Sequence, residues 1–160
     1  MKARRIPLSN GGFIRVDSSD YSACSQHKWF KFLVGRSYYA MTYIDREQVL
    51  LHRFLLSPPP EKHVDHANGD GLDNRRENLR VCSRAENMQT QRKKVGTQST
   101  FKGICKTGSG RWSASIEQSE NRLYLGAFDT EVEAAKQYDR AARVFFGRFA
   151  RTNEMLGLYN

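Results

Sequence analysis

The sequence predicts a mixed α+β protein built as two successive units. Three observations indicate this class: apolar runs are separated by turn sequences such as Asn10-Gly11-Gly12, two helix-start signals stand at Ser83 and Thr130, and residues 95–100 have the composition of a linker. Gly and Asn between apolar runs are typical of hairpins, and Ser or Thr followed three residues later by Glu begins helices. The expected organisation is a first unit over 1–94, a linker over 95–100, a second unit over 101–153 and a tail over 154–160.

The chain is strongly basic except in one short stretch. It has 160 residues and a net charge of +9, with 26 Lys and Arg against 17 Asp and Glu. Residues 63–83 instead carry four acids against three bases. This distribution favours a polyanionic partner that is brought to a local group of carboxylates. A generally basic, well-solvated protein is the alternative.

The cysteines and the apolar runs narrow the kinds of protein that this chain could be. Cys24, Cys82 and Cys105 are single and widely spaced, so the sequence predicts neither a zinc knuckle nor a disulfide framework. A reducing compartment is the simpler expectation. The chain has no run of 18 apolar residues and no long apolar stretch after its basic start, so we expect no membrane span and no signal peptide.

The leading residues predict short strands and turns, followed by a short helix. Residues 6–16 are expected to form a hairpin around Asn10-Gly11-Gly12. Residues 29–43 are rich in aromatic side chains, for which core packing is favoured and a stacking surface for bases is the alternative. Residues 49–56 are expected to form a helix ended by Ser57 and three prolines, with His52 in the core rather than in a site. The aromatic residues expected in the core are Trp29, Phe30 and Phe32, and Tyr38, Tyr39, Met41 and Tyr43 suggest another strand.

Residues 62–94 predict a strand, a turn-rich loop, a return strand and a helix. The helix is expected to begin at Arg84 and to run to about Lys94. Asp65 and His66 then lie on the first strand, and Asn87 lies one turn into the helix.

Asp65, His66 and Asn87 carry the chemistry of this stretch. The oxygens of Asp65 and Asn87 suit Mg²⁺ or Mn²⁺, with one ion per site. The imidazole of His66 is often neutral near pH 7 and can then accept a proton from water. The pattern predicts metal-assisted hydrolysis of a phosphodiester.

Other polar residues in the stretch receive different roles. Asn78 is expected to bridge backbone groups of the loop and so to fix His66. His63, two residues from Asp65, is a minor candidate for the site. Asn68, Asp70, Asp73 and Asn74 are expected to form turns.

The residues after 100 predict three hairpin-linked strands and one long helix. The strands are expected at 101–104, 111–116 and 122–126, and the helix over Glu131–Phe146, with Gly147 as its stop. The helix would lie on one face of the sheet through its alanines. The other face would carry Lys102, Arg111, Arg122 and Tyr124. Just before the linker, Arg92, Lys93 and Lys94 would either grip backbone phosphates or end a solvated helix.

The first unit resembles the HNH nucleases of the ββα-metal class, in the form found in phage and intron homing endonucleases. The resemblance is carried by Leu51-His52-Arg53, Val64-Asp65-His66, Asp73-Asn74, Asn78-Leu79-Arg80 and Asn87. It implies that His66 is the general base, that Asp65 and Asn87 bind the metal and that Asn78 is structural. Asn87 stands where other branches have histidine, which implies the H-N-N variant.

The second unit resembles an AP2 DNA-binding domain. The resemblance implies that the sheet enters the major groove of DNA, with contacts from Lys102, Arg111, Arg122, Tyr124 and, as a weaker candidate, Tyr138. The GC-box target of the plant members is not transferred, because their contact residues are replaced here by Cys105, Thr107, Ser109, Ser115 and Glu117. The motifs that carry the resemblance are Phe101-Lys102-Gly103-Ile104, Arg111-Trp112, residues 124–130, Glu133-Ala134-Ala135, residues 138–142 and Gly147.

The two resemblances together imply a site-specific DNA endonuclease of the homing type. Double-stranded DNA is the expected partner, with no membrane and no protein partner evident, in the cytoplasm of a bacterium or a phage-infected cell. One site per chain suggests nicking by a monomer or two cuts by a homodimer. A DNA-binding regulator with an inactive nuclease motif is the alternative, and an RNA-binding module is a weaker one.

Overall fold

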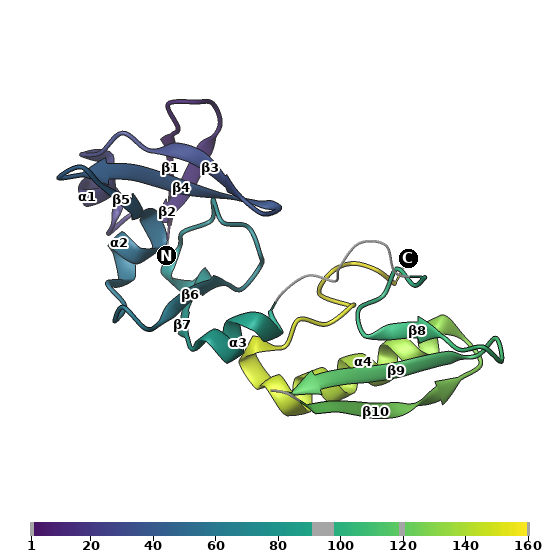
Figure 1. Cartoon of the computed structure of the whole chain (residues 1–160). Coiled ribbons are helices and arrows are strands. Elements are labelled where there is room, and N and C mark those ends of the chain that lie inside the picture. The colour runs from purple at the N-terminus through teal and green to yellow at the C-terminus, as the bar shows by residue number, and fades with distance from the viewer. Residues whose placement is uncertain (1, 91–97, 119–120, 160) are drawn as a thin grey trace. The chain divides into compact units, whose positions relative to one another are not determined.

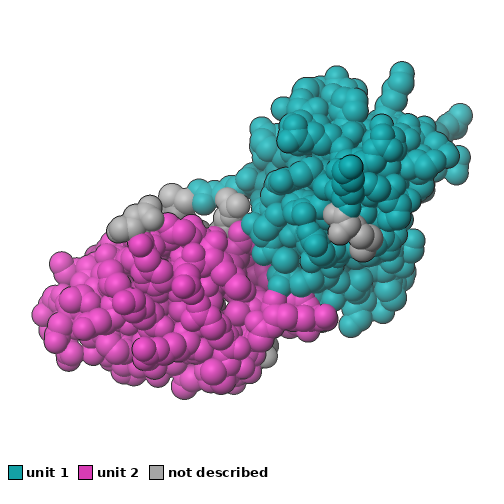
Figure 2. Space-filling view, turned by 180° about the vertical axis from the view of Figure 1, so that it is seen from behind, with its two compact units in different colours: residues 1–84 teal, residues 85–160 magenta. Residues whose placement is uncertain are grey.

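The computed structural model describes residues 2–90, 98–118 and 121–159. The chain forms two compact units, Met1–Arg84 and Ala85–Asn160, which Figure 2 shows in different colours. Several small antiparallel sheets and a few helices make up the units (Figure 1), so the predicted α+β class is confirmed. None of the helices in the described ranges is long and apolar enough to cross a membrane.

The first unit is built from three small sheets and short helices. Strands β1 and β2 pair in one sheet, β3, β4 and β5 form a second, and β6 and β7 form a third, all antiparallel. In chain order the elements are β1 (Ala3–Pro7), β2 (Phe13–Asp17), α1 (Tyr21–Ser25), β3 (Phe30–Val34), β4 (Ser37–Ile44), β5 (Glu47–Leu50), α2 (Leu51–Leu56), β6 (His63–His66), the 3₁₀ helix η1 (Arg76–Asn78) and β7 (Leu79–Cys82).

The leading hairpin forms as the sequence predicts and supplies half of one buried apolar cluster in this unit. Gly11 and Gly12 have φ values of +93° and +87°, which a residue with a side chain rarely adopts. Alternate residues of β1 and β2 then face inward, as expected for a half-buried hairpin. The buried cluster contains Ile6, Leu8, Ile14, Val16, Cys24, Trp29, Ala40 and Leu51.

Two predictions for residues 29–56 are wrong in part. Trp29 is buried as expected, but Phe32, Tyr38 and Tyr43 are 43%, 49% and 56% exposed. A side chain is buried only where a neighbouring element covers its face of the strand, and these fractions show that the described residues leave the three rings largely uncovered. The expected helix over 49–56 begins at Leu51, because Val49 and Leu50 pair with β4 as part of β5.

The second unit is a three-stranded sheet covered by one long helix. Its elements are α3 (Arg84–Gln89), which begins at the division, then β8 (Ile104–Lys106), β9 (Trp112–Gln118), β10 (Asn121–Phe128), α4 (Glu131–Phe146) and the 3₁₀ helix η2 (Gly147–Phe149). The strands lie in the order β10-β9-β8. Side chains of α4 such as Ala134, Ala135 and Ala142 form one buried cluster with Ile104, Ala114 and Ile116 of the sheet. The small alanines let the helix lie close to the strands, as the sequence predicts.

Helix α3 is shorter than predicted. It ends at Gln89 rather than near Lys94, and the hydroxyl of Thr90 donates to the carbonyl of Asn87 at 2.8 Å. Residues 91–97, which include Arg92, Lys93 and Lys94, lie outside the described residues. The carbonyls of Gln89 and Thr90 accept from Lys102 and Arg151, which groups the end of α3 with the second unit.

The end of the chain packs against this unit instead of trailing from it. Leu158 and Tyr159 pack on the buried cluster. The Asp139 carboxylate of α4 accepts from the backbone of Asn153 at 2.7 Å and from the Tyr159 hydroxyl at 2.8 Å. The expected tail is therefore part of the second unit's fold.

Candidate functional site

The β6–β7 hairpin places Asp65 beside a cation. In its register Asp65 lies opposite Arg80 and His66 lies opposite Leu79. The Arg80 guanidinium donates to Oδ2 of Asp65, whose side chain is only 8% exposed. Arg80 therefore balances the charge of a nearly buried carboxylate and holds one of its two oxygens.

His66 follows Asp65 and points into the first unit. It is 4% exposed, and its Nε2 lies 3.3 Å from Oδ1 of Asn74. Its ring centroid is 5.2 Å from that of His52 and 5.7 Å from that of Tyr39. Burial lowers the pKa of His66, against the opposing effects of Asn74 and Asp65. The ring is therefore neutral near pH 7.

The contact with Asn74 indicates which ring nitrogen of His66 is free to accept a proton. With the Asn74 amide assigned so that its Nδ2 donates to the Gly71 carbonyl, Oδ1 faces Nε2 of His66 and can only accept. The hydrogen of the neutral ring then belongs on Nε2, and Nδ1 keeps its lone pair. A general base needs such a lone pair.

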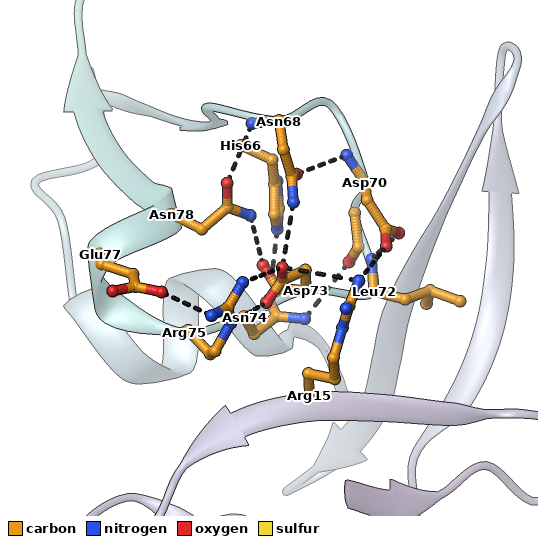
Figure 3. Close-up of polar contacts among 11 residues, drawn as sticks. Arg15, His66, Asn68, Asp70, Leu72, Asp73, Asn74, Arg75, Glu77 and Asn78 are labelled. Atoms are coloured by element: carbon orange, nitrogen blue, oxygen red, sulfur yellow. Dashed lines mark hydrogen bonds and ion pairs between the residues drawn. The ribbon is translucent and has the colours of Figure 1, made fainter. Parts of the chain in front are cut away.

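The Asn78 side chain bridges backbone groups of the loop between the strands. Its Oδ1 accepts from the Asn68 amide at 2.9 Å, and its Nδ2 donates to the Asp73 carbonyl at 2.7 Å (Figure 3). The backbone carbonyl of Asn78 also accepts from Ala67, next to His66. These bonds restrain both ends of the loop that begins at His66.

Of the four loop residues expected to form turns, Asn68 and Asp70 do so. Oδ1 of Asn68 accepts from the amide of Asp70, and Oδ1 of Asp70 accepts from the amide of Leu72. The Asp73 carboxylate is fully buried and binds the Arg75 guanidinium through both oxygens. This hydrogen bonding holds the pKa of Asp73 below its usual range.

Strand β2 forms backbone hydrogen bonds with the loop between β6 and β7, a contact that the sequence did not predict. The Arg15 amide donates to the Leu72 carbonyl at 2.9 Å, and the Asn74 amide donates to the Arg15 carbonyl at 2.8 Å. Backbone pairing over this distance in the sequence leaves no local pattern that could have indicated it.

Two aspartates at and after the end of β2 bind Arg76, in a later part of the same loop. Oδ2 of Asp17 accepts from the Arg76 amide, and the Arg76 guanidinium binds Asp20 through two hydrogen bonds of 2.8 Å. Residues 13–20 thus help to position the loop that holds Asn74 against His66.

The donor chemistry at Asp65 suits a hard divalent cation, although Arg80 holds Oδ2 of this carboxylate. Asn87 lies on α3, partly buried, in the second unit, so its pairing with Asp65 stays a prediction. Within the described ranges no three His, Cys, Asp or Glu side chains cluster as a metal site. His63 is exposed at the start of β6.

The sheet of the second unit presents some of the expected DNA contacts and not others. Arg122 and Tyr124 are exposed on β10, opposite Glu117 and Ser115 of β9, and the Arg122 Nε donates to the Ser115 hydroxyl. Arg111 precedes β9, half exposed, and bonds with Asp129 and the Ala127 carbonyl.

Lys102 and Tyr138 do not lie on the exposed face of the sheet, where a DNA contact was expected. The Lys102 ammonium donates to the Gln89 carbonyl, and burial lowers its pKa to about 8. Tyr138 is 3% exposed, in the core against Gly103, and burial raises its pKa. Lys102 precedes β8 and Tyr138 is on the packed side of α4, which accounts for both positions.

Comparisons with known proteins identify two kinds of relative. Residues 57–89 match the family model described as HNH endonuclease. The chain is 28% identical over 151 residues to an uncharacterised HNH endonuclease of Acanthamoeba polyphaga mimivirus, covering 91% of this chain and 76% of the viral protein.

Plant proteins match a shorter part of the chain. APETALA2-like protein 2 of Oryza sativa subsp. indica is 50% identical over 64 residues, and an AP2/ERF and B3 domain-containing transcription repressor of Arabidopsis thaliana is 40% identical over 73 residues. These matches cover 39% and 46% of this chain but only 15% and 20% of the plant proteins. The resemblance of this chain both to HNH endonucleases and to AP2-domain proteins is therefore confirmed.

Proposed function

We propose that this protein is a metal-dependent endonuclease that hydrolyses DNA phosphodiesters with His66 as the general base. The family match at residues 57–89 supports the reaction class. The observation that carries the role of His66 is its pairing with Asn74, which leaves Nδ1 of a neutral ring with its lone pair.

In this proposal His66 takes a proton from the attacking water at Nδ1, while Asn74 holds the ring by Nε2. Asn78 keeps the loop closed, so that the ring does not turn. His66 is 4% exposed, so water reaches it only through its surroundings. Reaction at this ring therefore needs a small local opening when the substrate binds.

Asp65 and Asn87 are the proposed metal ligands. A bound Mg²⁺ or Mn²⁺ would stabilise negative charge on the phosphate and on the leaving oxygen. Arg80 would then exchange Oδ2 of Asp65 for another partner, because the ion and the guanidinium compete for the same carboxylate.

The second unit is proposed to supply affinity for double-stranded DNA. The chain's similarity to plant AP2 proteins and the exposed cations Arg111 and Arg122 support this role. One arginine can donate two hydrogen bonds to a guanine in the major groove. Such a bidentate contact contributes roughly 1–3 kcal/mol of discrimination against the wrong base. The homing type and the H-N-N variant rest on the resemblance of residues 51–87 and are proposed on that basis.

The test is cleavage of supercoiled plasmid by the full chain and by His66→Ala, with Mg²⁺ and with EDTA. Loss of a general base lowers the rate by roughly 10²- to 10⁴-fold. We expect His66→Ala to lose that activity and to retain DNA binding in a gel shift. His63→Ala, on the exposed end of the same strand, is the matched control and is expected to cleave normally. Undiminished cleavage by His66→Ala would remove this residue from the role.

A DNA-binding regulator with an inactive nuclease motif is the second candidate. The burial of His66 and the ion pair of Asp65 with Arg80 favour it. The same plasmid assay decides, because such a regulator binds DNA and shows no cleavage that depends on added metal.

A further inference from the structure

An aromatic row leads from the surface of the first unit to His66. Opposite residues of an antiparallel pair project from the same face, and Phe32 of β3 lies opposite Tyr39 of β4. The Tyr39 ring lies 5.7 Å from the His66 ring between centroids, and Phe32 is 43% exposed. The row therefore runs from the exposed ring of Phe32, through Tyr39, to His66, the candidate general base.

A second aromatic pair extends this row on the same face. Phe30 lies two residues before Phe32 on β3, so both project to the same side. Tyr43 stacks on Phe30 with ring centroids 6.0 Å apart and an interplanar angle of 22°, and Tyr43 is 56% exposed. We call Phe30, Phe32, Tyr39 and Tyr43 the aromatic face.

The charge around the aromatic face favours a polyanion. Residues 28–47, which contain strands β3 and β4 and the start of β5, carry four bases, Lys28, Lys31, Arg36 and Arg46, against two acids, Asp45 and Glu47. Lys31 and Tyr38 project from the opposite face of the sheet, where the Lys31 ammonium lies 5.6 Å from the Tyr38 ring centroid, so the net positive charge is that of the sheet as a whole. An apolar protein partner would gain nothing from this excess of cations, whereas a nucleic acid would.

We propose that the aromatic face binds an unpaired stretch of DNA beside the phosphate that is cut. Exposed rings on a basic sheet bind single strands because each unpaired base offers a flat surface for stacking. In a duplex those surfaces are already covered by neighbouring bases. The inference rests on the proposed nuclease function, since the row ends at His66.

The test measures binding of the full chain to a fluorescein-labelled oligothymidylate of about 20 nucleotides, longer than one stacking site. A duplex of mixed sequence is measured in parallel, and EDTA prevents cleavage. Phe32→Ala and Tyr43→Ala are each expected to weaken binding of the single strand by about 5- to 150-fold, with a much smaller effect on the duplex. Tyr43→Phe should keep the affinity, because it retains the ring and loses only the contact of the hydroxyl with Gln48.

Two controls separate stacking from general loss of affinity. Phe145→Ala removes an aromatic ring that is 38% exposed on α4, and it should change neither affinity. Arg36→Gln should reduce the salt dependence of binding, whereas the ring variants should leave it unchanged, since only charges release counterions.

Three results would overturn the proposal. The first is unchanged affinity for the single strand in both ring variants. The second is tighter binding of oligouridylate than of oligothymidylate, which would assign the face to RNA. The third is a dimer, detected by sedimentation, that dissociates in the ring variants, which would assign the face to a second copy. His66→Ala should lose cleavage and keep strand binding, so failure of the nuclease proposal is distinguishable from failure of this one.

Discussion

Two buried histidines make the stability of the first unit sensitive to acid. Burial lowers the pKa of His52 to about 3 and also lowers that of His66, from an ordinary value of 6.5. The unfolded chain therefore takes up protons below pH 6.5 that the folded unit does not. The stability is retained above pH 6.5 and falls as the pH drops toward the pKa values of the two histidines in the folded state.

We predict that the free energy of unfolding of this unit falls as the pH drops below 6.5, by about 1.4 kcal/mol per pH unit through His52, whose folded pKa is about 3, and in the same direction through His66. His52→Gln should remove the part of that slope that is due to His52. Urea unfolding across the pH range measures it, and His63→Gln, on the exposed end of β6, serves as the control. An unchanged slope in His52→Gln would contradict the assignment.

At the scale of elements, helix α4 depends on its cap. The Thr130 hydroxyl accepts from the Glu133 amide, and the Glu133 carboxylate accepts from the Thr130 amide. We predict that Thr130→Ala destabilises the second unit by about 1 kcal/mol, because the Glu133 amide loses its partner. Thermal unfolding measures the loss, and Thr130→Ser should restore most of it. Equal stability of Thr130→Ala and the parent would show that the cap contributes little.

The turn before β8 depends on a glycine. Gly103 has φ +78°, and a Cβ there would lie 2.1 Å from the Tyr138 ring. We predict that Gly103→Ala destabilises the second unit by roughly 1–3 kcal/mol or more, through overpacking and backbone strain together. Gly108→Ala is the control, because nothing lies within 4 Å of a Cβ there. A soluble Gly103→Ala that unfolds at the parent's temperature would refute this reading.

Local signals in the sequence predicted most helices, strands and turns. They did not predict which faces of the strands are buried or which residues distant in the sequence make contact. The glycines at 11 and 12 and the cap at Thr130 act within a few residues, so their turns and helix starts were predictable. Exposure of Phe32 depends on where neighbouring elements end, which no alternation pattern contains. The hydrogen bonds of Asn74 to Arg15 and His66 join residues from different elements, so only the folded chain reveals them.

The positive charge of the chain predicts strongly salt-dependent DNA binding. The net charge is +9, and each neutralised phosphate contributes about 0.9 to the slope of log affinity against log salt. Arg122→Gln should reduce this slope by about that amount if the exposed β10 face contacts DNA. The matched control is Lys136→Gln on the exposed side of α4. Fluorescence titration at several salt concentrations measures the slope, and an equal effect of the two variants would exclude a special role for the sheet.

The hydrogen bond between Asp17 and Arg76 joins residues 59 positions apart. It limits how the segment that matches the HNH family model can be exchanged between genes. A recombination event that transferred only residues 57–89 would leave the Arg76 amide and the loop without their partners. A transferred segment that is to fold in the same way must therefore include the leading hairpin. The unit that can be transferred is longer than residues 57–89, which match the family model.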